Sequence, residues 1–294
     1  MMSSLSSAEE FKAAQKAGWD SVAVGWQEWW QTFEKDAQKL SDHLVELTKI
    51  NYNSKVLDIA TGIGEPAVTA AKKVSKGGDG SGYVLATDIA AHMLSIAKQR
   101  AASLGLQKMI EFKEGDAETI RLPTSKFDAA LCRWGLMYLP DLEAGLSNIY
   151  RSLVDGGRLA AAVWASSDKV PFLSVVMSTV LKETQKLPPP SGIPGPFSLA
   201  DQRITETTLS ETGFKDIAVQ RMNVIFTYDS AEEYTHFHQA ILAPAHALLA
   251  DQTPTRKEEI WNAVTQAVKK YADNSGSVKL NNEVICFSAT KEKK

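Results

Sequence analysis

From residue 55 onward, short apolar runs alternate with longer segments in which apolar residues recur every three or four positions. The short runs have the length and composition of buried strands, and the longer segments have the period of helices that lie on a core. Five such runs precede residue 165, at 55–60, 83–87, 109–113, 127–132 and 158–164. Strands that alternate with helices are typical of a parallel sheet covered on both faces. The pattern therefore predicts an α/β fold.

Turn and cap residues mark the ends of the connecting helices. Pro66 stands in the first turn of the first helix, where its missing N–H removes no bond, and Gly77–Gly78 is predicted to end that helix. A second helix is expected over 90–104, with Met93 and Leu104 on its buried face, and Asp141 is placed to cap the N-terminus of a third.

After residue 165 the alternation breaks, and a helix, a proline-rich loop and a further helix precede a strand at 217–226. Residues 230–273 have helical periodicity, in two segments divided near Thr253–Pro254, before a last strand at 284–289. We predict a Rossmann-like, mostly parallel seven-stranded sheet with helices on both faces and an antiparallel last strand. Residues 51–227 and 277–294 form this core, and the helical insertion at 228–276 forms a lid.

An aromatic-rich segment precedes the core and contains Trp19, Trp26, Trp29, Trp30 and Phe33. Its apolar residues recur at helical spacing, so we predict that residues 1–50 form a helical cap that lays this face on the core. Trp26 either packs there as a core residue or covers a ligand.

Composition narrows the function classes. The chain has 294 residues, 44% hydrophobic and 23% charged, with a net charge of −3, which disfavours a nucleic-acid binder. Cys132 and Cys286 stand far apart in apolar runs, which indicates neither a disulfide framework nor a metal site. The first residues lack the pattern of a secretory signal, and no apolar run reaches the ~20 residues that span a bilayer. We therefore expect a cytoplasmic protein without membrane association or a bound metal.

The first strand leads into the glycine turn VLDIATGIGEPA, with Asp58, Thr61, Gly62 and Gly64. Glycine allows the backbone to turn sharply and to approach a ligand closely. The G-x-G-x-x-A spacing also fits a dinucleotide site. However, a carboxylate at Asp58 would repel a pyrophosphate and attract a cation, and S-adenosylmethionine carries an ammonium and a sulfonium. The alternative is that Asp58 only caps the turn or the helix.

Acidic residues also follow the next two strands. Asp88 ends the second strand, where it can accept hydrogen bonds from a ribose diol, cap the next helix, or do both. Asp116 follows the third strand, where it can accept the adenine amino proton while Ala117 leaves space for the ring; Glu118 fits a surface loop nearly as well.

Together these stretches, over about residues 50–165, resemble class I S-adenosylmethionine-dependent methyltransferases, nearest to the ubiquinone/menaquinone biosynthesis group. The resemblance implies that the glycine turn holds the methionine part of the donor, that the acid ending the second strand holds the ribose, and that the loop after the third strand holds the adenine. It also implies that the end of FDAALCRWGLMYLPD lies beside the transferred methyl group. The implied donor-binding residues are Asp58, Thr61, Gly62 and Gly64; Asp88, Ile89 and Met93; Asp116 and Ala117; and Cys132, Arg133 and Trp134.

The acceptor pocket is expected where Trp134, Met137 and Tyr138 meet Trp26, a surface that suits a small apolar or aromatic molecule. Arg133-Trp134-Gly135 stands where DNA-base methyltransferases carry a (D/N)-P-P-(Y/F) stretch, which again disfavours nucleic acid.

A general base is needed only if the acceptor must lose a proton, and His236 and His238 are the candidates. Each could instead face solvent or be satisfied in the core. Two other functions fit the sequence: an NAD-dependent oxidoreductase, and a non-catalytic module that binds S-adenosylmethionine.

Overall fold

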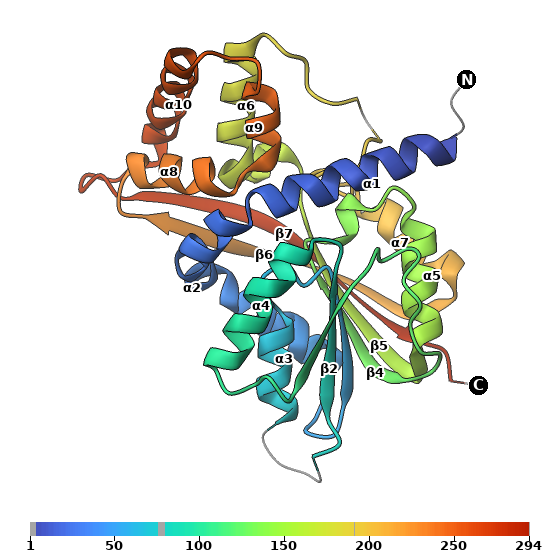
Figure 1. Ribbon diagram of the computed structural model, residues 1–294. Helices are drawn as coiled ribbons and strands as arrows, with labels where there is room; N and C mark the ends of the chain where they lie inside the picture. Colours follow the sequence, from blue (N-terminus) through green and yellow to red (C-terminus); the bar gives the residue numbers. More distant parts are fainter. Residues whose placement is uncertain (1–3, 76–79, 191, 294) are drawn as a thin grey trace.

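The computed structural model describes residues 4–75, 80–190 and 192–293, and its centre is a seven-stranded sheet (Figure 1). The strand order is β3-β2-β1-β4-β5-β7-β6, and β7 runs antiparallel to both of its neighbours. The predicted fold class is confirmed. The strands are β1 Lys55–Ile59, β2 Tyr83–Asp88, β3 Ile110–Glu114, β4 Phe127–Arg133, β5 Leu153–Trp164, β6 Phe214–Tyr228 and β7 Val278–Lys291.

The last three strands are longer than their apolar runs predicted. β6 is an edge strand whose exposed positions carry charged and polar residues such as Lys215 and Arg221. Backbone pairing with β7 continues through these positions from Phe214 to Tyr228. Hydropathy records burial rather than backbone pairing, so it underestimates the length of a half-exposed strand.

Helices cover both faces of the sheet (Figure 1). On one face lie α2, α3 and α4, and on the other lie α5 and α7. Asp141 caps α5 as predicted, since its carboxylate accepts the Ala144 N–H at 2.9 Å. Leu104 is 46% exposed rather than buried with Met93, because α4 ends one residue earlier. Gly77–Gly78, the predicted end of α3, lies outside the described residues. The bounds are α1 Ser4–Ser21, α2 Ala23–Thr48, α3 Ala67–Val74, α4 Ala91–Ser103, α5 Leu142–Ser152, α6 Pro171–Thr184 and α7 Gln202–Thr212.

The insertion after β6 forms three helices rather than the predicted two: α8 Ala231–Ile241, α9 Ala243–Leu249 and α10 Pro254–Val268. The additional break falls at Leu242, just before Pro244, which fits only the first turn of a helix. The predicted division at Thr253–Pro254 is present, with the Thr253 hydroxyl capping α10. These helices pack with α6 beyond one end of the sheet (Figure 1). No helix in the described ranges is long and apolar enough to cross a bilayer.

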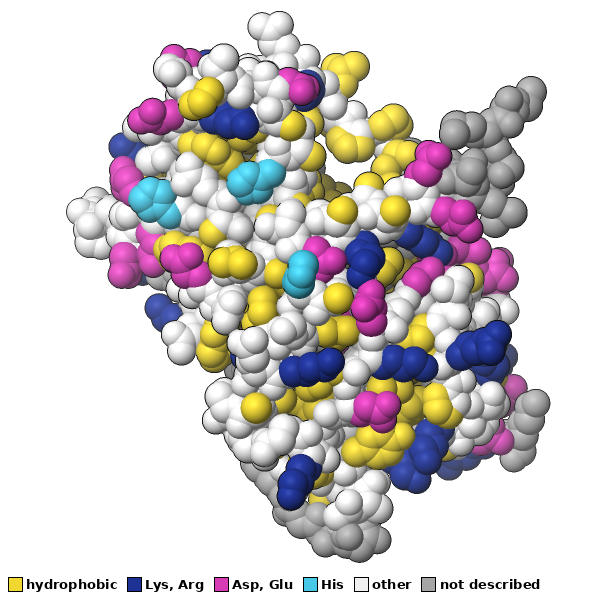
Figure 2. All heavy atoms as spheres, viewed as in Figure 1, with side chains coloured by type: hydrophobic (Ala, Val, Ile, Leu, Met, Phe, Trp, Pro, Cys, Tyr) yellow, Lys and Arg dark blue, Asp and Glu magenta, His cyan; other side chains and the backbone are white. Residues whose placement is uncertain are grey.

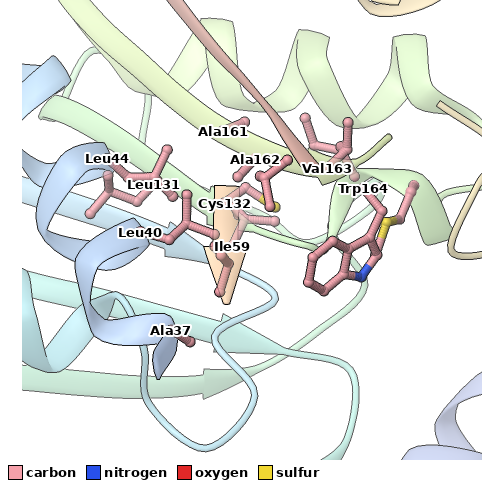
Figure 3. Close-up of a cluster of buried hydrophobic side chains, with 14 of the residues drawn as sticks. Ala37, Leu40, Leu44, Ile59, Leu131, Cys132, Ala161, Ala162, Val163 and Trp164 are labelled. Atoms are coloured by element: carbon pink, nitrogen blue, oxygen red, sulfur yellow. The ribbon is translucent and has the colours of Figure 1, made fainter. Parts of the chain in front are cut away.

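Helix α2 is held against the centre of the sheet by a dry apolar cluster (Figure 3). Leu40 and Leu44 are fully buried over Leu131 and the small residues of β5. Burial of each leucine stabilises the fold by about 1.5–3 kcal/mol. The packing fixes the rotation of α2 about its axis, and so it determines where Phe33 and Glu34, nearly two turns before Leu40, point.

Candidate functional site

A cavity of about 190 Å³ lies where the carboxyl ends of the parallel strands meet the N-terminal helices. Strand β1 pairs with β2 on one side and with β4 on the other, so the order of the strands across the sheet reverses between β1 and β4. Ligands of open α/β sheets bind at such a switch point. The cavity is lined by most of the residues that the sequence predicted for donor and acceptor: Trp26, Thr61, Gly62, Asp88, Ile89, Met93, Asp116, Ala117, Arg133, Trp134 and Tyr138.

The glycine turn needs its glycines for two reasons. Gly62 has φ of 56° with open space where a Cβ would stand, so its conformation alone favours glycine. Gly64 has φ of 103°, and an added Cβ would also lie 3.3 Å from the Cβ of Ala97 on α4. Glycine therefore lets α4 approach the turn closely, although Gly64 itself does not line the cavity.

Asp58 does not line the cavity. Its carboxylate is fully buried and accepts the Ala67 N–H at the start of α3, at 2.9 Å. Burial raises the pKa of this carboxyl to about 8. The geometry is that of the helix-cap alternative, because the backbone turns between Asp58 and Gly62 and directs the side chain under the turn. A contact between Asp58 and the donor stays a prediction.

Asp88 combines the two roles left open by the sequence. One carboxylate oxygen accepts the Ala90 N–H at 2.9 Å, just before α4, and the other accepts the Gly62 N–H at 2.8 Å. The carboxylate still lines the cavity, and its burial raises its pKa. The end of β2 is thereby joined to the glycine turn, with oxygen lone pairs left over for a ligand.

Helix α1 runs across the sheet on the side of the cavity (Figure 1), and its Lys12, Gln15 and Trp19 line that cavity. Two of its lysines tie the helix down. Lys12 Nζ donates to Asp116 Oδ2 at 2.8 Å and contacts Glu118. Lys16 Nζ donates to the Ile89 carbonyl oxygen at 2.9 Å and to Glu114. In the space-filling view, basic and acidic side chains lie next to one another beside α1 (Figure 2). The Ile89 carbonyl after β2 and the acids at and after the end of β3 thus hold α1. The sequence analysis missed this arrangement, although the two lysines stand one helical turn apart.

A buried charge cluster forms one wall. The Arg133 guanidinium donates to Glu34 on α2 and to the Ser41 hydroxyl, both at 2.8 Å, with a second, shorter contact to Glu34. Glu65, from the glycine turn, lies 3.5 Å from Arg100. Burial, with the nearby charge of Glu34, raises the pKa of Glu65. Glu34 and Glu65 both line the cavity, so it has more acidic groups than the sequence predicted.

Aromatic side chains continue the wall next to this cluster, because the Arg133 guanidinium lies 5.7 Å from the Phe33 ring centroid and 5.1 Å from that of Trp134. The Phe33 ring lies between two indoles, 5.0 Å from Trp26 and 5.5 Å from Trp134 between centroids. Trp134 stacks on Trp164 at 4.3 Å, and its backbone has φ of 59°, which is rare outside glycine. The indole nitrogens of Trp26 and Trp134 are buried without a hydrogen-bond partner. Trp26 therefore packs in the core and also faces the cavity.

Besides Asp58 and Gly64, four more predicted residues lie outside the cavity. Cys132 and Met137 are buried beneath it, and burial raises the pKa of the Cys132 thiol to about 12. His236 is exposed on α8. His238 is fully buried between Tyr234 and Phe172, its Nδ1 is 2.9 Å from the Tyr234 carbonyl oxygen, and burial lowers its pKa to about 4. The expectation that either histidine reaches the acceptor is thus corrected, because α8 packs against α2 and α10 instead.

The predicted position of the lid also changes. None of the described residues of 228–276 lines this cavity, whereas Lys12, Gln15 and Trp19 of α1 do. Helix α1, which belongs to the predicted cap of residues 1–50, therefore covers the site in place of the predicted lid. Within the described ranges, no group of three or more His, Cys, Asp or Glu side chains is arranged to hold a metal ion.

The lining residues from Ala60 to Pro140 fall within a segment that matches a known domain family, whereas those from the two N-terminal helices lie outside it. Residues 56–157 match the model of a methyltransferase domain family. A ubiquinone/menaquinone biosynthesis C-methyltransferase of Bradyrhizobium sp. (strain BTAi1) is 35% identical over 103 residues, which are 35% of this chain and 39% of that protein. The chain spans less than half of the length of the curated relatives that it matches, 39% to 46%. The similarity therefore concerns the domain and not the whole chain.

Solved structures share the fold over most of the chain. Phosphoethanolamine N-methyltransferase 2 of Haemonchus contortus, in complex with S-adenosylhomocysteine, has a TM-score of 0.58 at 18% identity, covering 93% of this chain and 58% of that one. The [4+2]-cyclase SpnF has a TM-score of 0.53 at 20% identity, covering 88% and 82%. Because these two proteins are named for different reactions, the fold alone does not determine the reaction.

Proposed function

We propose, from the match of residues 56–157 to the methyltransferase domain family, that the chain transfers a methyl group from S-adenosylmethionine to a small apolar or aromatic acceptor. The observation that carries the proposal is the single cavity that joins the glycine turn, Asp88 and Asp116 to an aromatic wall containing Trp134. One half suits a nucleoside and the other suits a flat apolar molecule.

The charges of the cavity favour the sulfonium donor over a dinucleotide. Glu34, Glu65, Asp88 and Asp116 all line it, and carboxylates attract the ammonium and the sulfonium. A pyrophosphate needs free N–H groups at a helix N-terminus, and at α3 the Ala67 N–H already binds Asp58. This argues against the NAD-dependent oxidoreductase.

In the proposed reaction, the donor supplies an electrophilic methyl group, and the chain's task is to align the acceptor with the S–CH₃ bond and exclude water. Positioning of this kind contributes ~7–11 kcal/mol to lowering the barrier. We assign the ribose to Asp88, the adenine to Asp116 and Ala117, and water exclusion to the helix α1 side chains over the mouth. Among the described lining residues there is no histidine, so a proton released by the acceptor would pass to a carboxylate, for which we propose Glu65.

A transfer screen tests this proposal. The purified chain is incubated with donor that carries a trideuterated methyl group and with panels of phenols, quinols and amines, and products are detected by mass spectrometry. A labelled aromatic product is expected. Binding of S-adenosylhomocysteine without transfer to any member would favour the non-catalytic module, and binding of NADH in its place would reject the proposal.

A further inference from the structure

We propose that the indole N–H groups of Trp26 and Trp134 donate hydrogen bonds to an oxygen of the methyl acceptor. The site would then select flat aromatic or conjugated molecules that carry a carbonyl or phenolic oxygen over plain hydrocarbons of the same shape. The inference rests on the proposed function, since it assigns the acceptor half of the same cavity.

Two unpaired donors in one cavity are the first observation. Both indole nitrogens are buried and lack a hydrogen-bond partner, and both residues line the cavity. Buried polar groups are nearly always paired, so an orphaned group in a native structure needs an explanation. A ligand atom that fills the cavity supplies one. Indole is a donor only, and therefore the matching ligand atom is an acceptor, most simply an oxygen.

The arrangement of the rings is the second observation. Trp26 comes from α2 and Trp134 from the turn after β4, yet each lies within 5.5 Å of Phe33, edge-on to it. The stacking of Trp134 on Trp164 at 4.3 Å fixes one indole plane. Rings held from two elements give flat, apolar walls, which favours a planar ligand whose oxygen is fixed by the two N–H groups.

The two halves of the cavity separate acceptor from donor. Asp88 ends β2 and Asp116 follows β3, on one side of β1, whereas Trp134 follows β4, on the other side. The acids match the hydroxyl and amino donors of a nucleoside, and the indoles cannot, because they accept no hydrogen bond. The carboxylate of the donor's amino acid is the competing partner for the indoles, and the experiment below separates it from the acceptor.

Nitrogen NMR of the full chain, labelled with ¹⁵N at the tryptophan indoles, reads these groups directly. S-adenosylhomocysteine is added to saturation, and acetophenone is then compared with α-methylstyrene, in which a methylene group replaces the carbonyl oxygen. Acetophenone should move the Nε1–H signals of Trp26 and Trp134 downfield, and α-methylstyrene should not. Acetophenone should bind more tightly by about 2- to 10-fold for each hydrogen bond.

Variants assign the signals and test the donors one at a time. Trp26→Phe and Trp134→Phe keep an apolar ring and remove the N–H. Each should therefore lower the affinity for acetophenone and leave the affinity for α-methylstyrene unchanged. Trp29→Phe is the matched control, because Trp29 lies on the same helix but outside the cavity, 5.8 Å from Phe237. If a variant does not fold, the titration of the unmodified chain still decides.

Two results would overturn the inference: movement of both indole signals by S-adenosylhomocysteine alone, which would assign them to the donor, or equal affinity for the two probes. Absence of any shift of the two indole signals at saturating acetophenone would also overturn the inference. Loss of S-adenosylhomocysteine binding would instead overturn the proposed function, and the two failures are distinguishable because acetophenone can also be titrated into the free protein.

Discussion

The ion pair between Glu34 and Arg133 ties helix α2 to the end of β4, and its removal has a calculable cost. The two side chains are 5% and 6% exposed, and the guanidinium also donates to Ser41. Substitution Arg133→Met keeps an apolar stem of similar length but leaves the Glu34 carboxylate buried without a cation. Breaking one side of a buried pair costs about 3–5 kcal/mol, and we expect a loss of that size in the free energy of unfolding.

A double variant, in which Glu34 is replaced as well, shows whether the loss of stability comes from the unpaired charge. In Glu34→Met/Arg133→Met no carboxylate is left unpaired at that position, and apolar replacements of buried pairs are often neutral. We expect the double variant to be more stable than Arg133→Met by roughly the 3–5 kcal/mol that the unpaired carboxylate costs.

Urea unfolding followed by circular dichroism measures these differences, provided that two probes give coincident transitions. Arg256→Met serves as the control, because Arg256 pairs with Glu183 and Glu259 at the surface and its replacement should change stability much less. The reasoning is refuted if Arg133→Met unfolds like the unmodified chain, or if the double variant is no more stable than Arg133→Met.

Three further predictions concern the site. Asp88→Ala should weaken S-adenosylhomocysteine binding and lower stability by about 1–3 kcal/mol, because the N–H groups of Gly62 and Ala90 lose their acceptor; unchanged calorimetric affinity would contradict the assignment. Since the Asp58 pKa rises from 3.8 to about 8 on folding, the folded state retains a proton that the unfolded state releases, and stability should fall as the pH rises through that window. In Asp58→Asn, the decrease of stability with pH should be smaller when unfolding midpoints are measured across this pH range. An equal decrease in the variant and the unmodified chain would contradict the role of Asp58. Lys12→Gln should speed S-adenosylhomocysteine association in stopped-flow measurements and make it less salt-dependent, because α1 loses its contacts with Asp116 and Glu118; identical rates would exclude α1 as a barrier.

The core of the site was predictable because its information is local. A strand, a glycine turn and a helix follow one another between Lys55 and Val74, and the next strand ends at Asp88. The sequence therefore places Gly62 and Asp88 at one sheet edge without knowledge of the rest of the fold. Trp134 was found for the same reason, since it follows an apolar run directly.

The missed features depend on contacts between distant segments. Glu34 lies 99 residues from Arg133, and Lys12 lies 104 residues from Asp116, so no window of the sequence contains both partners. His238 was misplaced because helical periodicity does not tell which neighbour a face meets, and its side meets Phe172 rather than the cavity. Asp58 shows a third limit, because a carboxylate before a turn can face either the ligand or the next helix, and the backbone path decides.

The central claim is that this cavity binds S-adenosylmethionine and its product S-adenosylhomocysteine rather than a dinucleotide. Isothermal titration calorimetry of the purified chain with S-adenosylhomocysteine and, separately, with NADH tests this claim most directly. Saturable binding of one S-adenosylhomocysteine molecule per chain, lost on Asp88→Ala, with no heat from NADH, is the predicted result. No heat from S-adenosylhomocysteine at millimolar concentration, together with saturable binding of NADH, would contradict it.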